Sequence, residues 1–197
     1  GPLHVEDVRD KRPIQETFLD AMNEFGIPRN PDFNGSDQAG CGHYQFTQHN
    51  GRRWSTASAY LDEAKKRKNV TILTHAVTHR ILFDGVKATG VEVFVKGKKQ
   101  KINGQQVILS GGSIASPQLL ELSGVGDADR LQKLGITVVH NSPDVGEHLQ
   151  DHLLSRVVFG TDPEVSINRE VRGWRLGLSS LNWFFRRQGP LTTGSAP

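Results

Sequence analysis

The sequence has a single cysteine, Cys41, so no disulfide bond can form within its 197 residues and nothing points to an oxidising compartment. No apolar run approaches the roughly 20 residues that a membrane-spanning helix requires. The 21 glycines and 9 prolines show no triplet repeat, which excludes collagen, and 36% hydrophobic residues are too many for a disordered chain. The composition is therefore that of an ordinary globular protein, with one domain or pieces of two.

A strong charge of either sign is also absent. Lys and Arg number 24 against 21 Asp and Glu, and a net charge of +3 over this length gives a weak field. The dense basic runs, residues 65–68 and 96–101, are typical of a solvated helix end and a hairpin tip. Neither contains interleaved aromatic side chains on which bases would stack, so we expect no nucleic-acid partner. A non-catalytic binding module stays open as an alternative.

The N-terminal third predicts helices separated by polar loops. Apolar residues recur at three- and four-residue spacings after Pro13, which predicts a helix that ends at Gly26. Two further elements are expected before residue 69: a strand over residues 44–48, and a helix over residues 55–66 with Ser55 as N-cap and with Tyr60 and Leu61 facing inward.

From residue 69 to residue 112 the pattern changes to strands. Asp84-Gly85, Lys96-Gly97 and Asn103-Gly104 are turn signals between short runs of apolar residues. They predict a β-meander that ends in a buried strand. Its strands are expected over residues 70–74, 77–83, 88–95 and 106–110.

Helical patterns return after the meander. The first predicts a helix over residues 116–122, with Ser116 as N-cap and Pro117 in the first helical position. The elements expected beyond it are a helix over residues 127–134, a strand over residues 136–140 and a partly buried helix over residues 172–187.

The most informative unit is the junction between the last meander strand and this helix, which consists of Ser110, Gly111 and Gly112. A glycine turn lets a ligand approach main-chain N–H groups without obstruction by a Cβ atom. The following helix N-terminus offers free donors that suit phosphate or ribose oxygens. In doubly wound folds nucleotides bind at such junctions, although glycine turns there also serve close packing alone.

The same residues allow a serine hydrolase as the runner-up interpretation. Gly111-Gly112-Ser113-Ile114-Ala115 nearly matches the nucleophile elbow G-x-S-x-G, with alanine in place of the last glycine. A triad would need an aspartate and a later histidine, which Asp144, Asp151 and His152 offer. They follow closely behind Ser113, which leaves little chain to carry acid and base to separate loops.

Paired histidines raise the question of a metal. His148 and His152 are four residues apart, as are His75 and His79. This spacing faces one metal only on a helix. The second pair falls in a strand region, where four residues span about 13 Å, and the first follows a turn. We therefore expect satisfied or exposed histidines and no metal.

Residues 112–126 resemble the second signature of the glucose–methanol–choline (GMC) oxidoreductases, in its choline and alcohol dehydrogenase branch. Further segments resemble the family in the family's own order. They are Asn50-Gly51-Arg52-Arg53-Trp54-Ser55 with Ala59-Tyr60-Leu61, Asn69–Thr74, Arg80–Phe83, Gly90-Val91-Glu92, Val145–His152 and Arg187–Thr192.

The resemblance implies a mixed α/β (α+β) fold, with part of a Rossmann-like FAD-binding domain and its β-meander joined to pieces of an antiparallel-sheet substrate domain. Residues 1–65 would be substrate-domain and connecting segments, and residues 66–150 part of the FAD-binding domain. Residues 151–197 would begin the C-terminal substrate-binding segment.

The resemblance also implies an FAD-dependent oxidoreductase that acts on the CH–OH group of choline or another primary alcohol. A histidine base removes the hydroxyl proton while hydride passes from the alcohol carbon to flavin N5. The family's adenine-contacting valine aligns with Thr78, with Val77 beside it, and Ser110-Gly111-Gly112 matches the turn that passes close to the adenosine part of FAD. The asparagine of the family's N-L-x-D-H motif is replaced by His148.

Two family motifs do not occur in this sequence: the G-x-G-x-x-G FAD fingerprint and the H-P-x-G-T-like segment with the catalytic histidine. The resemblance therefore implies an internal piece of a longer enzyme, inactive by itself and without a catalytic residue of its own. The parent enzyme is expected in the cytoplasm or at a membrane surface, with a small-molecule alcohol as substrate.

Overall fold

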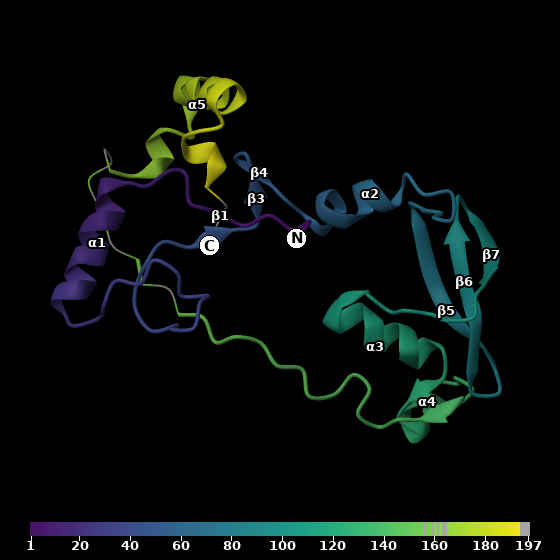
Figure 1. The fold of residues 1–197 in the computed structure, drawn as a ribbon. Coiled ribbons are helices and arrows are strands. Elements are labelled where there is room, and N and C mark those ends of the chain that lie inside the picture. Colours follow the sequence, from purple (N-terminus) through teal and green to yellow (C-terminus); the bar gives the residue numbers. More distant parts are fainter. Residues whose placement is uncertain (156, 159, 161, 163–164, 194–197) are drawn as a thin grey trace. The chain divides into compact units, whose positions relative to one another are not determined.

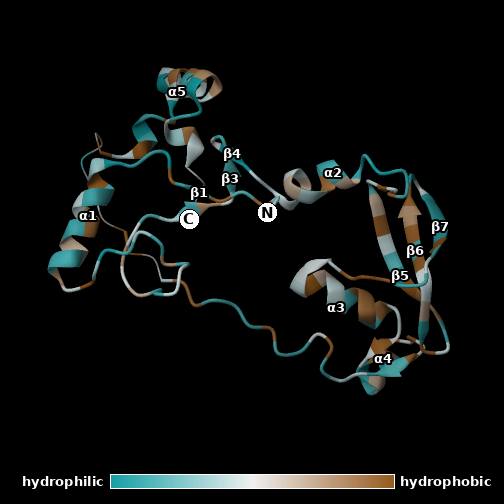
Figure 2. Cartoon of the chain, viewed as in Figure 1, coloured by the Kyte–Doolittle hydropathy of each residue, from teal (hydrophilic) through white to brown (hydrophobic). Residues whose placement is uncertain are grey.

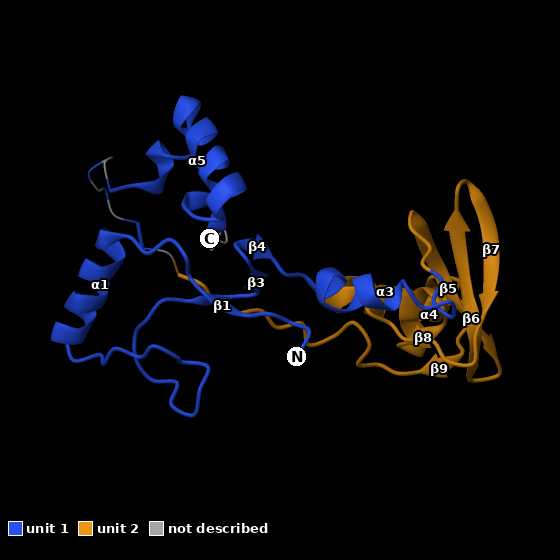
Figure 3. Ribbon diagram, turned by 45° about the horizontal axis from the view of Figure 1, so that its top comes forward, with its two compact units in different colours: residues 1–71, 157–197 blue, residues 72–156 orange. Residues whose placement is uncertain are grey.

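A computed structural model describes residues 1–197 except residues 156, 159, 161, 163–164 and 194–197. The chain forms two compact units, which are coloured separately in Figure 3. Unit 1 consists of residues 1–71 and 157–197, and unit 2 of residues 72–156. In the part of the chain that the structure describes, no helix is both long and apolar enough to span a bilayer.

Unit 1 combines short antiparallel strand pairs with helices. Helix α1 (Pro13–Glu24) confirms the predicted first helix; the Gln15 side chain accepts a hydrogen bond from the Arg12 N–H at 3.0 Å, and Gly26 follows with φ of +99°. The other elements are β1 (Glu6–Asp7) paired with β2 (Gln45–Phe46), β3 (Gln48–His49) paired with β4 (Arg52–Arg53), π-helix η1 (Ala57–Leu61), α2 (Asp62–Ala64), the 3₁₀ turns η2 (Ile167–Arg169) and η3 (Pro190–Thr192), and α5 (Gly173–Arg186).

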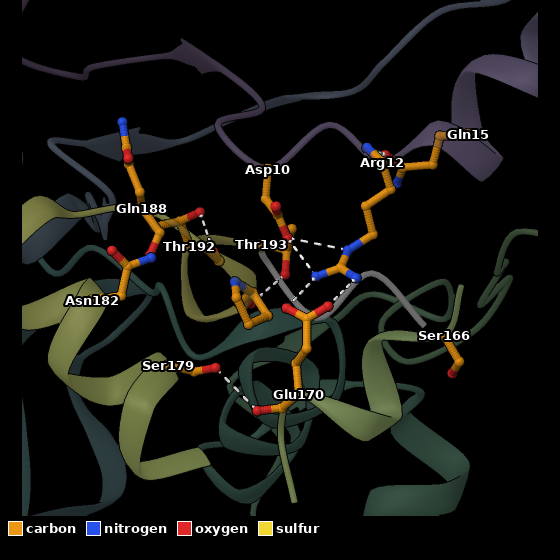
Figure 4. Close-up of polar contacts among 12 residues, drawn as sticks. Asp10, Arg12, Gln15, Ser166, Glu170, Ser179, Asn182, Gln188, Thr192 and Thr193 are labelled. Carbon is orange, nitrogen blue, oxygen red and sulfur yellow. Dashed lines mark hydrogen bonds and ion pairs between the residues drawn. The ribbon is translucent and has the colours of Figure 1, made fainter. Parts of the chain in front are cut away.

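An ion-pair cluster joins the two chain segments of unit 1 (Figure 4). The guanidinium of Arg12 donates to Asp10 Oδ2 at 2.9 Å and to Glu170 Oε1 at 2.8 Å, and its side chain is only 15% exposed. The Ser179 hydroxyl donates to the Glu170 carbonyl at 3.0 Å. A second link is the Trp183 indole, whose Nε1–H donates to the Gly51 carbonyl at 2.9 Å.

Three details of the sequence-based prediction for unit 1 are wrong. The strand expected over residues 44–48 is divided between β2 and β3, and the helix expected over residues 55–66 is π-helical in its first part. Tyr60 and Leu61 are 52% and 41% exposed, while Ala59 is buried, because the wider π turn departs from the 3.6-residue period. Helix α5 forms as predicted, with residues that are of intermediate burial or exposed.

Unit 2 is built on an antiparallel three-stranded sheet in the order β5 (Ala76–Asp84), β6 (Lys87–Val95) and β7 (Lys98–Asn103) (Figure 1). Ile81 pairs with Val91, which pairs with Ile102. Helix α3 (Gly112–Leu122) packs against β5, and the pair is followed by α4 (Ala128–Lys133) and by β8 (Val125–Gly126) parallel to β9 (His140–Asn141). Figure 2 shows the hydrophobic residues of α3 and β6, and the core of the unit consists of Ile81, Val93 and Leu131.

The meander turns at Asp84-Gly85 and Lys96-Gly97 are confirmed, but the strands expected over residues 70–74 and 106–110 are not regular strands. No described strand pairs with either segment, and a strand exists only with a hydrogen-bonding partner. Of the strand expected over residues 136–140, only His140 is in a strand, namely β9, whose partner β8 has two residues. Residues 70–74 and 106–110 have suitable side chains and lack a paired strand.

The start of α3 differs from the prediction. The helix begins at Gly112, so Pro117 lies inside it rather than in its first position. Ser116 is not the N-cap; its hydroxyl accepts a hydrogen bond from the N–H of Gly111 at 3.0 Å. This bond fixes the glycine turn to the first turns of the helix.

Candidate cofactor-binding site

Unit 2 contains a cavity of about 670 Å³ between the meander and the segment that leads into α3. This volume is within the range of about 300–1,000 Å³ that is typical of small-molecule sites. Val77 and Thr78 of β5 line it, as do Ser110 and Gly111 of the segment that leads into α3. The other lining residues include Gly90, Val91 and Ile102 of the sheet, Val107, Ile108 and Leu109 of the connecting segment, and Leu119 and Leu122 of α3. Aliphatic side chains thus form most of the lining.

The glycine turn presents bare main chain beside this cavity. Gly112 has φ of +87°, a conformation that favours glycine, and a Cβ atom placed on it would meet nothing within 4 Å. A Cβ atom on Gly111 would instead lie 3.4 Å from the Ser116 Oγ and the Ala115 Cβ. The turn therefore packs closely against α3 at Gly111 and is open at Gly112.

The electrostatics of the turn suit a negatively charged group. The first N–H groups of a helix have no intrahelical acceptor and carry partial positive charge. The first turn of α3 contains no acidic side chain that would neutralise it. Phosphate or ribose oxygens would find donors at this turn beside the cavity, and a planar base would find aliphatic side chains among the lining residues. The residues present thus fit the adenosine part of a dinucleotide.

The β5 side of the cavity contains a β-bulge. The pairing of β5 with β6 shifts between Thr78 and Arg80, which leaves His79 as an extra residue in the strand. Such a bulge turns the residues beside it relative to the regular sheet. Thr78 pairs with Val93, one of the most buried residues of unit 2, so its backbone is held firmly although its side chain is exposed.

Four of the five residues predicted to bind the cofactor, Val77, Thr78, Ser110 and Gly111, line this single cavity, and Gly112 follows directly in the chain. They come from positions more than thirty residues apart in the sequence, and the meander brings them together. Their contact with a cofactor stays a prediction.

The residues of the alternative chemistries do not form such a site. Ser113 is exposed in the first turn of α3, and no hydrogen bond joins its side chain to a histidine among the described residues. His148 Nε2 lies 3.4 Å from Asp144 Oδ1 on the surface. Across the described ranges, no three His, Cys, Asp or Glu side chains are grouped so that they would hold a metal ion.

Unit 1 contains a larger cavity, of about 1,110 Å³, that the sequence analysis missed. Aromatic side chains line it, namely Phe18 of α1, Phe33, Tyr44 and Phe46. Arg12 lines it too, as does His43, whose Nε2 lies 2.7 Å from Glu16 Oε1. Hydrogen bonds from His43 and Arg29 lower the pKa of the Glu16 carboxyl. These aromatic residues come from separate loop and helix segments, so no local pattern in the sequence announces the cavity.

Comparison with known proteins shows the family to which the chain belongs. The GMC oxidoreductase family model matches residues 1–154, and the chain belongs to this family. It is 41% identical over 190 residues to mitochondrial choline dehydrogenase of Mus musculus, covering 96% of the chain and 32% of that protein. It is 40% identical over 200 residues to an alcohol dehydrogenase [acceptor] of Pseudomonas putida, covering 100% of the chain and 36% of that protein.

A solved structure shows the same fold. A formate oxidase of Aspergillus oryzae RIB40, studied for the modification of its FAD, aligns with a TM-score of 0.84 at 23% identity, over 98% of this chain and 34% of that one. The chain thus spans about a third of the length of the relatives it matches. The expectations of the GMC family, of a mixed fold with small antiparallel sheets and of FAD as cofactor are confirmed. Nothing in the comparisons supports a serine hydrolase.

Proposed function

We propose that the complete protein is an FAD-dependent oxidoreductase that oxidises the CH–OH group of choline or another primary alcohol. The observation that carries this proposal is the unit 2 cavity, whose walls contain Val77, Thr78, Ser110 and Gly111 in a chain of the GMC family. The substrate class rests on the choline and alcohol dehydrogenases to which the chain is similar. FAD, when bound, supplies the acceptor for the hydride of the alcohol carbon.

In this proposal the residues of unit 2 bind and orient the adenosine half of FAD. The open main chain at Gly112 and the first N–H groups of α3 face its polar oxygens, while the aliphatic lining excludes water from the base. We assign residues 66–150 to the FAD-binding domain. Residues 1–65 and 151–197 are assigned to substrate-domain and connecting segments. Catalytic groups are assigned to parts of the complete protein outside this chain.

The experiment uses the complete protein purified with its cofactor. We expect a flavin absorbance spectrum and reduction of a redox dye in the presence of choline or an alkanol. A folded protein without bound flavin would refute the proposal. Dye reduction by neither choline nor any alkanol would refute the substrate class.

A pair of variants tests the cavity itself. Thr78→Phe places an aromatic ring on the cavity wall, so we expect flavin content to fall several-fold. Val86→Phe adds the same ring on the exposed turn between β5 and β6, where Val86 is 74% exposed, and we expect it to retain flavin. Equal flavin content in the two variants, at equal thermal stability, would contradict the assignment of the cavity.

A further inference from the structure

The hydroxyl of Ser123 connects the two elements that bound the cofactor cavity. Its Oγ accepts a hydrogen bond from the N–H of Ile81 in β5 at 2.8 Å and donates to the carbonyl of Leu119 in α3 at 2.5 Å. Ser123 is 8% exposed and Ile81 5% exposed, so the bond between them is shielded from water, whereas the bond to Leu119 is partly buried. This side chain is the direct hydrogen-bonded link between α3 and β5 among the side chains that the structure describes.

The link lies directly after an irregular stretch of β5. Strand β5 is at the edge of the sheet, with β6 on one side only. Its pairing with β6 is irregular between Thr78 and Arg80, directly before Ile81. The bond to Ser123 is thus an attachment of β5 to a rigid element immediately after the bulge.

Ser123 does not itself line the cavity, but its partners belong to elements that do. Leu119 lines the cavity from α3, and Thr78 lines it from β5, three residues before Ile81. A change at Ser123 would therefore act on the cavity through the spacing of its two walls. The N–H of Ile81 would also lose its acceptor in a buried place, which favours movement of the strand.

We propose that Ser123 is a positioning residue that sets the distance between the β5 wall and the α3 wall, and thereby the affinity for the adenosine half of FAD. This inference rests on the proposed function, because it takes the cavity to be the adenosine site. It assigns no role to Ser123 in contacting the cofactor or in the chemistry.

The test uses the complete protein after removal of its cofactor, with ADP as the probe of the adenosine half and riboflavin as the probe of the flavin half. Calorimetric titration of Ser123→Ala should give ADP affinity about tenfold weaker than wild type, from the loss of a buried hydrogen bond. Riboflavin affinity should change less than about twofold on the same reasoning, because only the adenosine walls move. Ser123→Thr, which keeps the hydroxyl, should restore ADP binding.

The matched control is Ser179→Ala, which also removes a hydroxyl that donates to a backbone carbonyl, but in unit 1. It should leave ADP affinity unchanged. The inference is overturned if Ser123→Ala binds ADP like wild type, or if ADP and riboflavin weaken equally in both alanine variants. A wild-type protein that carries no flavin refutes the proposed function instead, so the two failures are distinguishable.

Hydrogen exchange of the wild type keeps the inference testable if Ser123→Ala does not fold. Addition of ADP should slow exchange at the Ile81 amide together with the Thr78 amide, because the bond to Ser123 couples the strand to α3. Protection of the glycine turn without protection of Ile81 would overturn the inference.

Discussion

The ion pair between Arg12 and Glu170 should contribute to the stability of unit 1 in a manner that depends on pH. Arg12 donates two hydrogen bonds to Glu170, at 2.8 and 3.1 Å, and a further pair to Asp10. These bonds from Arg12 lower the pKa of the Glu170 carboxyl, while partial burial acts in the opposite direction. Since Arg12 also contacts Asp10, replacement of Arg12 alone would remove more than one interaction.

The size of the coupling free energy between Arg12 and Glu170 follows from the burial of their side chains. Exposed pairs contribute about 0–1 kcal/mol, whereas removal of one partner from a fully buried pair costs about 3–5 kcal/mol. The Arg12 side chain is 15% exposed and that of Glu170 42% exposed, so solvent screens the pair in part. We expect a coupling free energy of about 1–2 kcal/mol at pH 7 from a double-mutant cycle of Arg12→Ala and Glu170→Ala.

The pH dependence has a definite sign. Because the folded-state pKa of Glu170 is below the unfolded value of about 4.3, the stabilisation is fully present above that pH. It is lost as the pH falls through the folded-state pKa. Urea unfolding can be followed by the fluorescence of Trp54, Trp174 and Trp183, the chain's three tryptophans, all of which lie in unit 1. A coupling of zero at pH 7, or one that persists unchanged after protonation of Glu170, would refute the reasoning.

Two further predictions concern unit 2 and are checked by urea unfolding followed by far-ultraviolet circular dichroism. Leu131 is fully buried, with 0% exposure, so Leu131→Ala should lower the free energy of unfolding by about 2–5 kcal/mol; a loss below about 1 kcal/mol would contradict its place in the core. Gly124→Ala should destabilise strongly, because the new Cβ would lie 2.3 Å from the Thr137 carbonyl at φ of +91°. Gly135→Ala, at φ of +73° with nothing within 4 Å, should cost only the backbone strain of about 1–2 kcal/mol, and equal losses in the two variants would show that the contact is unimportant.

The sequence predicted the turns and helices that are determined by residues close together in the chain. The turn at Lys96 and Gly97 was predicted, and both residues have positive φ as a tight hairpin turn requires, although β7 after it was not among the expected strands. Helix α4 is similarly local, since Asp127 accepts a hydrogen bond from the Arg130 N–H at 2.7 Å as its N-cap. In contrast, residues 106–110 have the composition of a buried strand and are not paired, because pairing depends on a partner that no local pattern reveals.

The candidate site was predictable only in part, for a related reason. A glycine turn between an apolar run and a helix marked Ser110, Gly111 and Gly112, while Thr78 entered through the family resemblance alone. Only the structure shows that Thr78 and Gly111 line the same cavity. The position of Ser123 was visible in the signature, but its bond to Ile81 joins residues 42 apart and required the structure.

The replacement of the family's asparagine by His148 can be explained by the backbone. His148 has φ of +57°, in the left-handed region that β-branched and bulky residues avoid. Asparagine and histidine are both enriched there among non-glycine residues, so the exchange keeps a residue type that tolerates this conformation. Asp144 lies 3.4 Å from the His148 ring, and Arg130 binds Glu147 at 2.8 Å and the Val145 carbonyl at 3.2 Å, which holds the turn before it. His148 is thus a residue type that tolerates the left-handed backbone found at this position.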